Sequence, residues 1–525
     1  MTNPFLGRTL AVINDLSVDE RHYLFRHTKK LKEAINNNNA SVVDGYRIND
    51  KNKGITLVFL EDSTRTRESF LNAAEFHRTK VNVFDASHSS FNKKESFADA
   101  FNTLVGYDNQ IFIIRSKQEG ICRWLQEAGS KYAVRNKIKP SPMFINAGDG
   151  KHEHPTQELL DEFTFLEHNN WDSSTIHIVL VGDLYHGRTV HSKADGLKIF
   201  KNVEIDLIAP AELAMPESYL KKMKANGFKV RVFSSIDEYM KQKNIATKWY
   251  FTRPQLERMG EDILRRQDEL RSYITFKPEF MKLLPTGTRF YHPLPRHKEH
   301  PTIPNWLDDT ALNGWEQQSR NGYFIRIILL GAIDGKIGDD FVGKQCVVTE
   351  YEDNFIDEIP ITEADVQKRN EGIHPIREGI VIDHICKGEE SESIWEHLAT
   401  IRKIMGFSGT GYRGVAKSNK DGLSKGIISI PAHKDINERQ IKMLAAVSPG
   451  CTLNFISNSE VTKKLNLNMP PRIYGFKQIA CANEACISHP DNDENIEGEF
   501  FRQGSKTFVC KYCEKPHFFK DIWVE

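Results

Sequence analysis

The sequence predicts an α/β protein with two parallel-sheet subdomains, followed by a small α+β domain and a cysteine-bearing β domain. Three observations favour this class. Nine short apolar runs alternate with helical stretches over the first three-fifths of the chain, a pattern typical of parallel sheets with crossover helices. The later part of the chain has strand-like and helical stretches without that alternation. Four of the 8 cysteines lie close together near the C-terminus.

The nine apolar runs are short enough to be strands and are separated by helical spacing. Ser17 and Glu20 form a capping box that opens the first helix. The helical stretch "HPTQELLDEFTFLEHNN" divides the runs into two groups, and the helix "NGYFIRIILLGAI" is expected to pack back on the first sheet. The expected strands span 55–60, 81–84, 111–115, 143–146, 176–182, 203–209, 230–233, 249–252 and 288–292.

Length and charge narrow the class of protein. A chain of 525 residues is too long for one hydrophobic core, so several domains are expected. The 71 basic residues balance the 71 acidic residues, which gives no reason to expect a nucleic acid polymer or a membrane surface as partner. The N-terminus lacks the apolar core of a signal peptide, and no apolar run could span a bilayer. We therefore expect a cytoplasmic protein.

Changes in pattern along the chain suggest its domain boundaries. Residues 1–153 and 154–317 form the two α/β subdomains, and a helix at about 318–335 completes the first of them. Residues 336–371 are acidic and weakly periodic, so we expect a linker or irregular connector there. Residues 372–475 predict the small α+β domain, and residues 476–525 hold the cysteine cluster.

The segment "LVFLEDSTRTRESF" places hydroxyl and guanidinium groups where a strand turns into a helix. Ser63, Thr64, Arg65, Thr66 and Arg67 follow the strand directly. A helix N-terminus presents unpaired N–H groups and partial positive charge, which favour an anion. A capped helix with arginines in surface ion pairs is the simpler alternative. Five donor side chains at the ligand-binding end of a strand favour a phosphate cradle instead.

Further polar residues follow the ends of other expected strands. For each residue alone, a structural role is the simpler explanation, such as a helix cap for His154. With Arg65, four arginines at four strand ends together predict a polyanionic substrate set, of about one phosphate plus carboxylates. The residues at these positions are Arg115, His154 with Gln157, Arg188, Arg253 with Gln255, and Leu294.

Four motifs in fixed order carry a resemblance to a known family. "STRTR", "HPTQ", "GRTVHS" and "HPLPR" make residues 5–335 resemble aspartate carbamoyltransferase. The first two are shared by the wider carbamoyltransferase family. "HPLPR" and the pair Arg253 and Gln255 indicate aspartate as acceptor, because ornithine enzymes have a cysteine where Pro293 stands. The resemblance implies the carbamoyltransferase fold and carbamoyl transfer from carbamoyl phosphate to L-aspartate, giving N-carbamoyl-L-aspartate and phosphate in pyrimidine biosynthesis.

The resemblance also implies a role for each candidate residue, with no cofactor needed for catalysis. Arg115, His154 and Thr66 would donate hydrogen bonds to the carbonyl oxygen, which becomes negative during attack. Arg188 and Arg253 would clamp the aspartate carboxylates. The phosphate would be held by Ser63, Thr64, Arg65 and Thr66, and the reacting groups oriented by Gln157, Gln255 and the backbone carbonyls near Pro293, Leu294 and Pro295.

In this family a lysine loop enters the site from the neighbouring subunit. "HSSFNKKESFADAF" is similar to that loop and would give Ser90 and Lys94 this role. Without the resemblance, Lys94 would be taken as an ordinary solvated residue. A shared site implies a homo-oligomer built on catalytic trimers.

The cysteine cluster predicts a metal site. Cys481 and Cys486 form a C-x4-C pair, and Cys510 and Cys513 form a C-x2-C pair. Four thiolates in two such pairs suit one structural, tetrahedral Zn²⁺ per chain, and four free buried thiols are the alternative. This zinc-ribbon-like segment and "GIVIDHI" look like the regulatory chain of the same enzyme, which is normally a separate polypeptide and is fused here.

The resemblance extends to a nucleotide effector site. Asp383, His384 and Lys464 fall at positions that contact a nucleotide in the family. Ile430 falls where a second phosphate-facing lysine is expected, so the effector pattern departs from the family there. Nucleotide effectors are accordingly expected partners whose identity the sequence leaves open.

Two other functions remain open at this point. The chain could be a carbamoyltransferase for another amino acceptor, such as ornithine, although Arg253 and the missing cysteine motif argue against it. It could also be a non-catalytic, nucleotide-sensing zinc protein with an inactive transferase domain. In such a protein we would expect at least one hydrogen-bond donor of the active-site motifs to be replaced, and none is replaced here.

Overall fold

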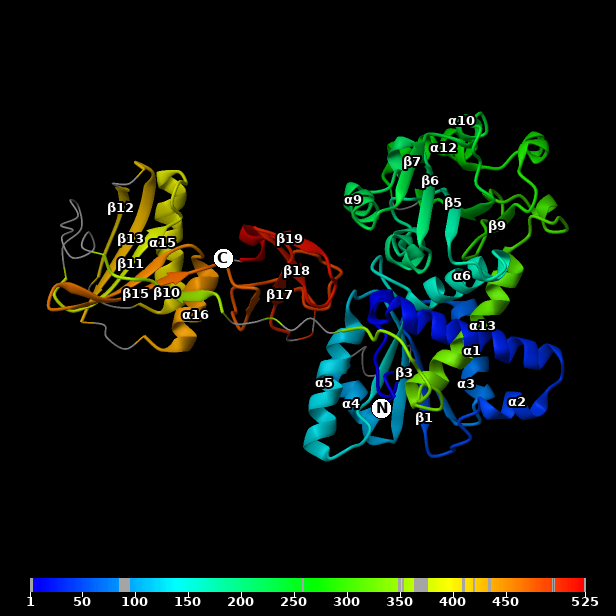
Figure 1. The fold of residues 1–525 in the computed structure, drawn as a ribbon, viewed down its shortest axis with the longest axis horizontal. Helices are drawn as coiled ribbons and strands as arrows, with labels where there is room; N and C mark the ends of the chain where they lie inside the picture. Colours follow the sequence, from blue (N-terminus) through cyan, green and yellow to red (C-terminus); the bar gives the residue numbers. More distant parts are fainter. Residues whose placement is uncertain are drawn as a thin grey trace. The chain divides into compact units, whose positions relative to one another are not determined.

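The chain folds into two compact units in a computed structural model (Figure 1). The first unit comprises Met1–Val347 and Glu484–Asn495, and the second comprises Val348–Asn483 and Ile496–Glu525. The structure describes residues 3–84, 95–256, 259–347, 351, 354–362, 376–407, 411–418, 421–432, 436–492, 494 and 496–523.

The first unit contains two parallel sheets, which confirms the predicted α/β class. The nine expected strands are all present, four in one sheet and five in the other. The four-stranded sheet has the order β2 (Lys80–Phe84), β1 (Gly54–Phe59), β3 (Asn109–Ser116), β4 (Met143–Asp149). The five-stranded sheet has the order β7 (Lys229–Phe233), β6 (Asn202–Ile208), β5 (Thr175–Val181), β8 (Lys248–Phe251), β9 (Arg289–Tyr291).

Helices connect and cover these strands. Ser17 caps α1 as predicted, because its hydroxyl accepts from the Glu20 N–H at 3.1 Å while the Glu20 carboxylate accepts from the Ser17 N–H at 2.8 Å. The longer helices are α1 (Val18–Asn36), α3 (Thr64–Phe76), α4 (Phe97–Gly106), α5 (Ile121–Asn136), α6 (Pro155–His168), α9 (Glu217–Ala225), α12 (Gln267–Ile274) and α13 (Trp315–Asp334). The short ones are α2 (Ala40–Gly45), α7 (Arg188–His191), α8 (Lys193–Gly196), α10 (Ile236–Tyr239) and α11 (Glu261–Arg265).

Helix α6 follows the last strand of one sheet and precedes the first strand of the other. Every residue from Pro155 to Leu166 except Gln157 is buried, so α6 is enclosed on all sides. Its buried residues include the carboxylates of Glu158, Asp161 and Glu162, which need partners in such surroundings. The final helix α13 packs against α1, α3 and α6.

The segment after α13 differs from the expected irregular connector. Its first part lies on the first unit, where Phe341 packs against Phe5 and Tyr23 and the Lys344 N–H donates to Asp19 at 2.8 Å. Its later part supplies strand β10 (Ile356–Glu358), which pairs with a strand of the second unit. The acidic sequence gave no signal for these contacts, because one depends on a single aromatic residue and the other on hydrogen bonds between backbones.

The described residues of the second unit form a six-stranded antiparallel sheet with two helices, followed by a small four-stranded sheet. The larger sheet has the order β10, β15 (Glu460–Leu467), β14 (Thr452–Ser457), β11 (Gly379–Ile385), β13 (Ser424–Pro431), β12 (Tyr412–Lys417). Its helices are α15 (Ser391–Met405) and α16 (Glu438–Val447). The smaller sheet has the order β16 (Arg472–Tyr474), β17 (Glu499–Arg502), β18 (Thr507–Cys510), β19 (Pro516–Phe518).

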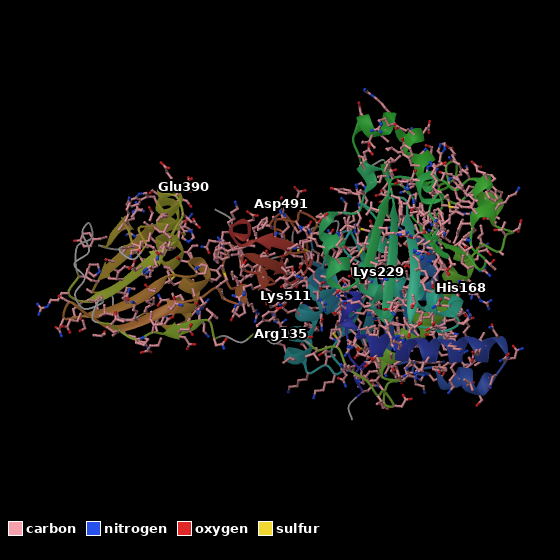
Figure 2. All side chains as sticks on the ribbon, turned by 45° about the horizontal axis from the view of Figure 1, so that its top comes forward. Arg135, His168, Lys229, Glu390, Asp491 and Lys511 are labelled. Carbon is pink, nitrogen blue, oxygen red and sulfur yellow. The ribbon has the colours of Figure 1, made fainter. Side chains whose placement is uncertain are left out.

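The surfaces of both units are rich in charged side chains. Arg135, Lys229 and Glu390 are exposed examples (Figure 2). Among the described residues, no helix combines the length and apolar character that crossing a membrane requires.

The buried pair of Arg21 and Glu162 joins α1 to α6 and generates a stability prediction. Arg21 Nη1 lies 2.7 Å from Glu162 Oε1, and the two side chains are 2% and 0% exposed. Arg21→Ala should lower the free energy of unfolding of this unit by about 3–5 kcal/mol, because it leaves a buried carboxylate uncompensated. Urea denaturation measures the loss. Arg135→Ala, at an exposed arginine, is the control, and an equal loss in both variants would contradict the prediction.

Candidate active site and metal centre

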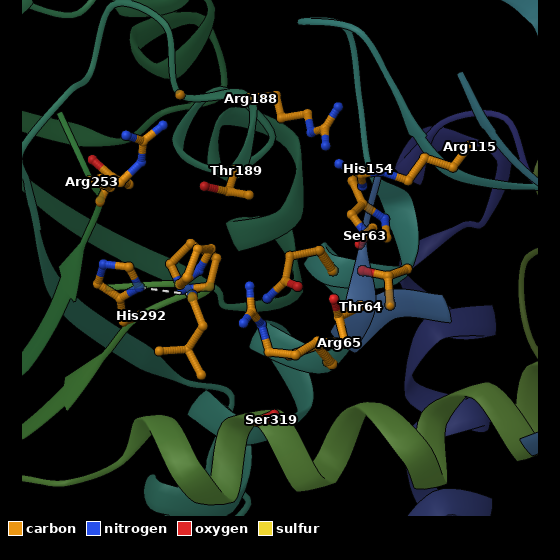
Figure 3. Close-up of a pocket in the computed structure, with 18 of the residues that line it drawn as sticks. Ser63, Thr64, Arg65, Arg115, His154, Arg188, Thr189, Arg253, His292 and Ser319 are labelled. Atoms are coloured by element: carbon orange, nitrogen blue, oxygen red, sulfur yellow. Dashed lines mark hydrogen bonds between the residues drawn. The ribbon is translucent and has the colours of Figure 1, made fainter. Parts of the chain in front are cut away.

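A pocket of about 530 Å³ lies at the carboxyl ends of strands from both parallel sheets (Figure 3). The segments that line it follow β1, β4, β5, β8 and β9 or end β3, as expected of ligand sites in α/β proteins. Ser90 and Lys94 lie outside the described residues. The other candidate active-site residues all line the pocket: Ser63, Thr64, Arg65, Thr66, Arg115, His154, Gln157, Arg188, Arg253, Gln255, Pro293, Leu294 and Pro295.

Two helix N-termini at this pocket lack side-chain caps. Ser63 is the N-cap residue of α3 and His154 that of α6, and neither side chain makes a capping hydrogen bond. Some other helices have such caps, as Ser17 caps α1 and the Ser96 hydroxyl accepts from Asp99 N–H at the start of α4, while others, such as α5 and α13, have none. Uncapped N–H groups facing a pocket make a site for an anion.

The pocket has a marked excess of positive charge. Among the described residues that line it, five are arginines, namely Arg65, Arg115, Arg188, Arg253 and Arg326, and two are carboxylates, Glu61 and Asp62, which gives these residues an excess of three positive charges. Burial lowers the pKa of Arg65, and it lowers the pKa of Arg326 to about 9. Burial and the charge of Arg188 lower the pKa of Arg115 to about 10, against the effect of Glu61. A polyanionic ligand would offset this repulsion.

Backbone carbonyls position two of the guanidinium groups. Arg115 Nη1 donates to Ala147 O at 3.1 Å, and Arg188 Nη1 donates to Gly150 O at 2.6 Å. Both groups pass close to Gly148, which has φ +117°. A Cβ there would lie 2.8 Å from Arg115 Nη1 and 3.0 Å from Arg188 Nη2. Glycine at this position therefore permits both the backbone conformation and the close approach of the two arginines.

His154 is a buried, neutral imidazole at the same pocket. It is 5% exposed, and burial, together with the charges of Arg188, Arg326 and Arg115, holds its pKa well below the usual range. Within the described structure its Nε2 is buried and has no hydrogen-bond partner. The Thr156 hydroxyl lies 3.4 Å from Nδ1. The unpartnered Nε2 is thus available to a ligand in the pocket.

The loop after β9 forms another wall of the pocket. His292 Nδ1 accepts from Leu294 N–H at 2.7 Å, which is the dashed contact in Figure 3, and His292 N–H donates to Gln318 Oε1 at 2.9 Å. Burial, with Arg296, Arg65 and Arg253 nearby, lowers the pKa of His292 to about 3. Leu294 has φ 57°, a conformation that non-glycine residues rarely adopt. These two hydrogen bonds hold the loop in place.

The sequence analysis missed several residues of the pocket. Arg326 is buried in α13, which was expected only to pack, and its Nη1 donates to Ser69 Oγ at 2.6 Å. Its signal was a single charge within the apolar run "YFIRIILL". Gln318 lies on the same helix, and Thr189 follows Arg188 on α7. Thr189 lies within the motif "GRTVHS" but was given no role, and no local motif marks Gln318.

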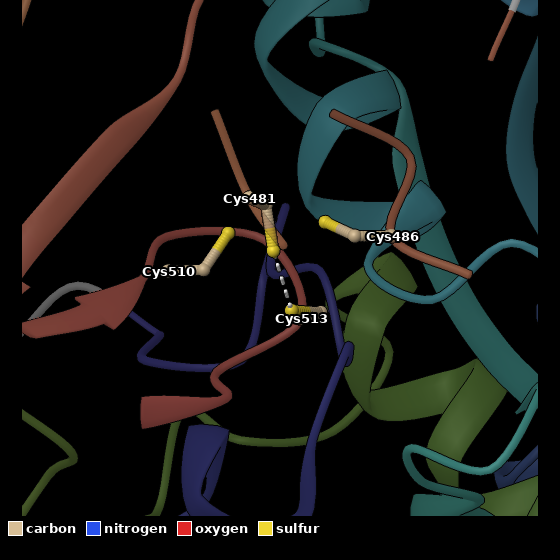
Figure 4. A group of neighbouring side chains, drawn as sticks. All are labelled: Cys481, Cys486, Cys510 and Cys513. Carbon is tan, nitrogen blue, oxygen red and sulfur yellow. Dashed lines mark hydrogen bonds between the residues drawn. The ribbon is translucent and has the colours of Figure 1, made fainter. Parts of the chain in front are cut away.

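The four predicted metal ligands come together in a buried cluster (Figure 4). The sulfur atoms of Cys481, Cys486, Cys510 and Cys513 all lie within 4.8 Å of one another, and the Sγ atoms of Cys481 and Cys513 are 3.6 Å apart. Four thiolates about 2.3 Å from one tetrahedral ion would be about 3.8 Å apart. The cluster therefore fits a structural metal, and among the described residues it is the one group of this kind.

The expected effector residues lie on the larger sheet of the second unit. Asp383 Oδ2 accepts from Lys425 Nζ at 2.7 Å, and His384 Nδ1 lies 3.1 Å from the Thr452 hydroxyl. Burial lowers the pKa of His384; Asp383 opposes this, while Lys425, Lys387 and Lys464 add to it. Sequence reasoning missed Lys425. Ile430 pairs with Ile380 in the sheet.

Family models match three parts of the chain. The model "Aspartate/ornithine carbamoyltransferase, carbamoyl-P binding domain" matches residues 8–167. The models of the aspartate carbamoyltransferase regulatory chain match residues 371–468 for the allosteric domain and 471–523 for the metal binding domain. Catalytic and regulatory sequences therefore occur in one chain, as the motifs predicted.

Similar proteins extend these matches to full length. The chain is 57% identical to Protein PyrBI of Treponema denticola, covering 100% of this chain and 99% of that protein. It is 53% identical to Protein PyrBI of Thermotoga maritima, with 100% of both chains covered.

Solved structures resemble the first part of the chain. Aspartate transcarbamoylase from Trypanosoma cruzi, in complex with carbamoyl phosphate and aspartate, is 28% identical over 63% of this chain and 97% of that chain, with a TM-score of 0.52. The catalytic subunit of M. jannaschii aspartate transcarbamoylase is 28% identical, covers 62% and 97%, and has a TM-score of 0.52. The chain belongs to the aspartate carbamoyltransferase family, with the catalytic and regulatory chains fused in one polypeptide.

Proposed function

We propose that this protein transfers the carbamoyl group of carbamoyl phosphate to the amino group of L-aspartate in pyrimidine biosynthesis. The products are N-carbamoyl-L-aspartate and phosphate. The observation that carries this proposal is the pocket with five arginines against two carboxylates. Its excess of positive charge suits a phosphate dianion together with an amino acid that has two carboxylates.

The phosphate belongs at the uncapped N-terminus of α3. There the N–H groups, the hydroxyls of Ser63, Thr64 and Thr66 and the Arg65 guanidinium supply donors around one anion. The partly buried setting of Arg65 strengthens its interaction with a phosphate charge.

The carbamoyl carbonyl belongs beside Arg115, His154 and Thr66. As the aspartate amine attacks, a C–N bond forms and the carbonyl oxygen becomes negative, so fixed donors around it lower the barrier. The C–O bond to phosphate then breaks, and its electron pair leaves with the phosphate. His154 is a weak base because its pKa is low, so the departing phosphate is the better acceptor for the amine proton.

The aspartate carboxylates belong at Arg188 and Arg253, with Gln255 beside them. Gln255 N–H donates to Asp183 Oδ2 at 2.9 Å, which fixes the loop after β8. Ornithine is the weaker candidate acceptor, because its side-chain ammonium would add to the positive charge of the pocket. A non-catalytic role is weaker still, since every described donor of the proposed mechanism lines the pocket.

The remaining parts of the proposal concern assembly and regulation. We assign the first sheet and α13 to carbamoyl phosphate, the second sheet to aspartate, and the six-stranded sheet to nucleotide effectors near Asp383, His384 and Lys464. Ser90 and Lys94 would complete the site of a neighbouring subunit in a catalytic trimer. The cysteine cluster would hold one zinc ion whose role is structural, and the protein would act in the cytoplasm.

A direct assay tests the reaction. Purified protein with carbamoyl phosphate should form N-carbamoyl-L-aspartate from aspartate, with ornithine offered in parallel as the competing acceptor. Product formation is followed by colorimetric detection of the ureido group and by phosphate release. Turnover with ornithine but not with aspartate would contradict the proposal, and so would a lack of turnover with both acceptors.

Two arginine variants test the division of the pocket. Arg253→Ala should raise the KM for aspartate by at least about tenfold and leave carbamoyl phosphate binding nearly unchanged, because it removes one carboxylate partner. Arg65→Ala, the matched variant at the other substrate, should nearly abolish turnover and weaken carbamoyl phosphate binding. Steady-state kinetics and calorimetric binding separate the two effects. Equal losses for both substrates in both variants would mean that the assignment is wrong.

Metal content tests the cysteine cluster. The purified protein should contain about one zinc per chain by mass spectrometry, and Cys510→Ala should lose it, because three thiolates hold the ion more weakly. Cys451→Ala is the control, since Cys451 is buried but lies outside the cluster. Chelation should unfold the segment around β16–β19, which is seen by proteolysis. Zinc retention in Cys510→Ala, or its loss in both variants, would argue against the site.

A further inference from the structure

A buried lysine holds two carboxylates of α6 directly behind the pocket. Lys193 Nζ lies 2.5 Å from Glu158 Oε2 and 2.7 Å from Asp161 Oδ2, and the three side chains are at most 1% exposed. Burial works against the charge of Lys193, but Asp161 and Glu158 raise its pKa above the usual value. Burial raises the pKa of Glu158. Lys193 and Asp161 therefore form a salt bridge in the interior.

The second oxygen of Asp161 accepts from two side-chain amides. Gln157 Nε2 lies 2.9 Å from Asp161 Oδ1, and Gln318 Nε2 lies 2.6 Å from the same atom. An ionised carboxylate can only accept hydrogen bonds. Both amides must therefore turn their NH₂ groups toward Asp161, which leaves their carbonyl oxygens facing away from it.

The side-chain oxygens of Gln318 and Gln157 serve different parts of the pocket, the first a backbone N–H of the loop after β9 and the second the space for a ligand. Gln318 Oε1 accepts from His292 N–H at 2.9 Å, so this branch fixes the start of the loop that contains Leu294. Gln157 is the residue of α6 that is not buried between Pro155 and Leu166, and it lines the pocket. With its NH₂ held by Asp161, Gln157 offers an oxygen acceptor to a ligand there.

We propose that Asp161 is a positioning residue for carbamoyl transfer, because it orients the Gln157 amide so that its oxygen receives an N–H of the carbamoyl group. A carbamoyl NH₂ has two donors, and the surrounding guanidiniums can only donate. A flipped Gln157 would present its own NH₂ to these donors and lose the contact. The inference rests on the role of Gln157 in the proposed function.

The variant Asp161→Asn tests it. Asparagine keeps the shape but places an NH₂ against either Lys193 or the two amides, so one set of contacts is lost. We expect kcat to fall by at least about tenfold, since small misplacement of a substrate-orienting group has effects of this size. The KM for aspartate should change by less than about twofold, because Gln157 contacts the other substrate.

Glu162→Gln is the matched control. Glu162 is on the same helix and equally buried, but its partner is Arg21 rather than an amide of the pocket. This variant should lower the melting temperature and keep kcat within about twofold of the unmodified protein. An equal fall of kcat in both variants would overturn the proposal, because it would show a general effect of disturbing α6.

A double-mutant cycle with Gln157→Ala tests the role of Gln157 in binding the carbamoyl group separately from the role of Asp161 in orienting Gln157. If Asp161 acts through Gln157, the two losses in kcat should overlap in the double variant, whereas independent losses would multiply. Multiplying losses overturn the proposal. Normal kinetics in Gln157→Ala would refute the role of Gln157 itself. An impaired Gln157→Ala with a fully active Asp161→Asn would refute only the positioning role. If Asp161→Asn does not fold, Asp161→Ser, which keeps one acceptor, takes its place in the cycle.

Discussion

Five guanidinium groups of the described residues line one partly buried pocket, and their burial, with the repulsion between Arg115 and Arg188, is the constraint that the surrounding structure must meet. Glu61 lies 3.5 Å from Arg115, backbone carbonyls of Ala147 and Gly150 accept from two of the arginines, and burial lowers the pKa values of Arg65, Arg115 and Arg326. Among the described residues that line the pocket, these five arginines stand beside two carboxylates, Glu61 and Asp62. Helix N-termini without caps add to the same field. This concentration of donors and positive charge makes the pocket suited to anions.

Helix α6 connects this charged pocket to the protein interior. Its first turn carries His154 and Gln157, and its next turn carries carboxylates that are held by Lys193 and Arg21. These buried pairs need complete sets of partners, so they fix the rotation of the helix more closely than apolar packing alone would. The positions of His154 and Gln157 in the pocket consequently depend on ion pairs that lie outside the pocket.

Much of the fold and site could be predicted because both have local signals. The nine strands are short apolar runs between helices. The candidate arginines lie at the ends of strands, and the family motifs mark the same positions. Arg326 and Gln318 escaped notice because they line the pocket from a helix that is distant in sequence from its motifs, and Asp161 because it contacts Gln157 rather than the pocket itself. Strands β10, β12 and β15 were missed because they are polar, and β10 and β12 lie at the edges of their sheet. Ser90 and Lys94 stay predictions, since they lie outside the described residues.

The connector is anchored in two places. It therefore keeps the local concentration of the second unit near the first from falling when the protein is diluted. Cys346 Sγ donates to Asn14 O of the first unit, and β10 begins at Ile356 in the second unit. The intervening chain can reach at most about 36 Å when fully extended. Short tethers of this kind give effective concentrations in the range of about millimolar. A fused regulator therefore stays at fixed one-to-one stoichiometry with its catalytic unit at any level of expression, which separate genes for the two chains could not guarantee.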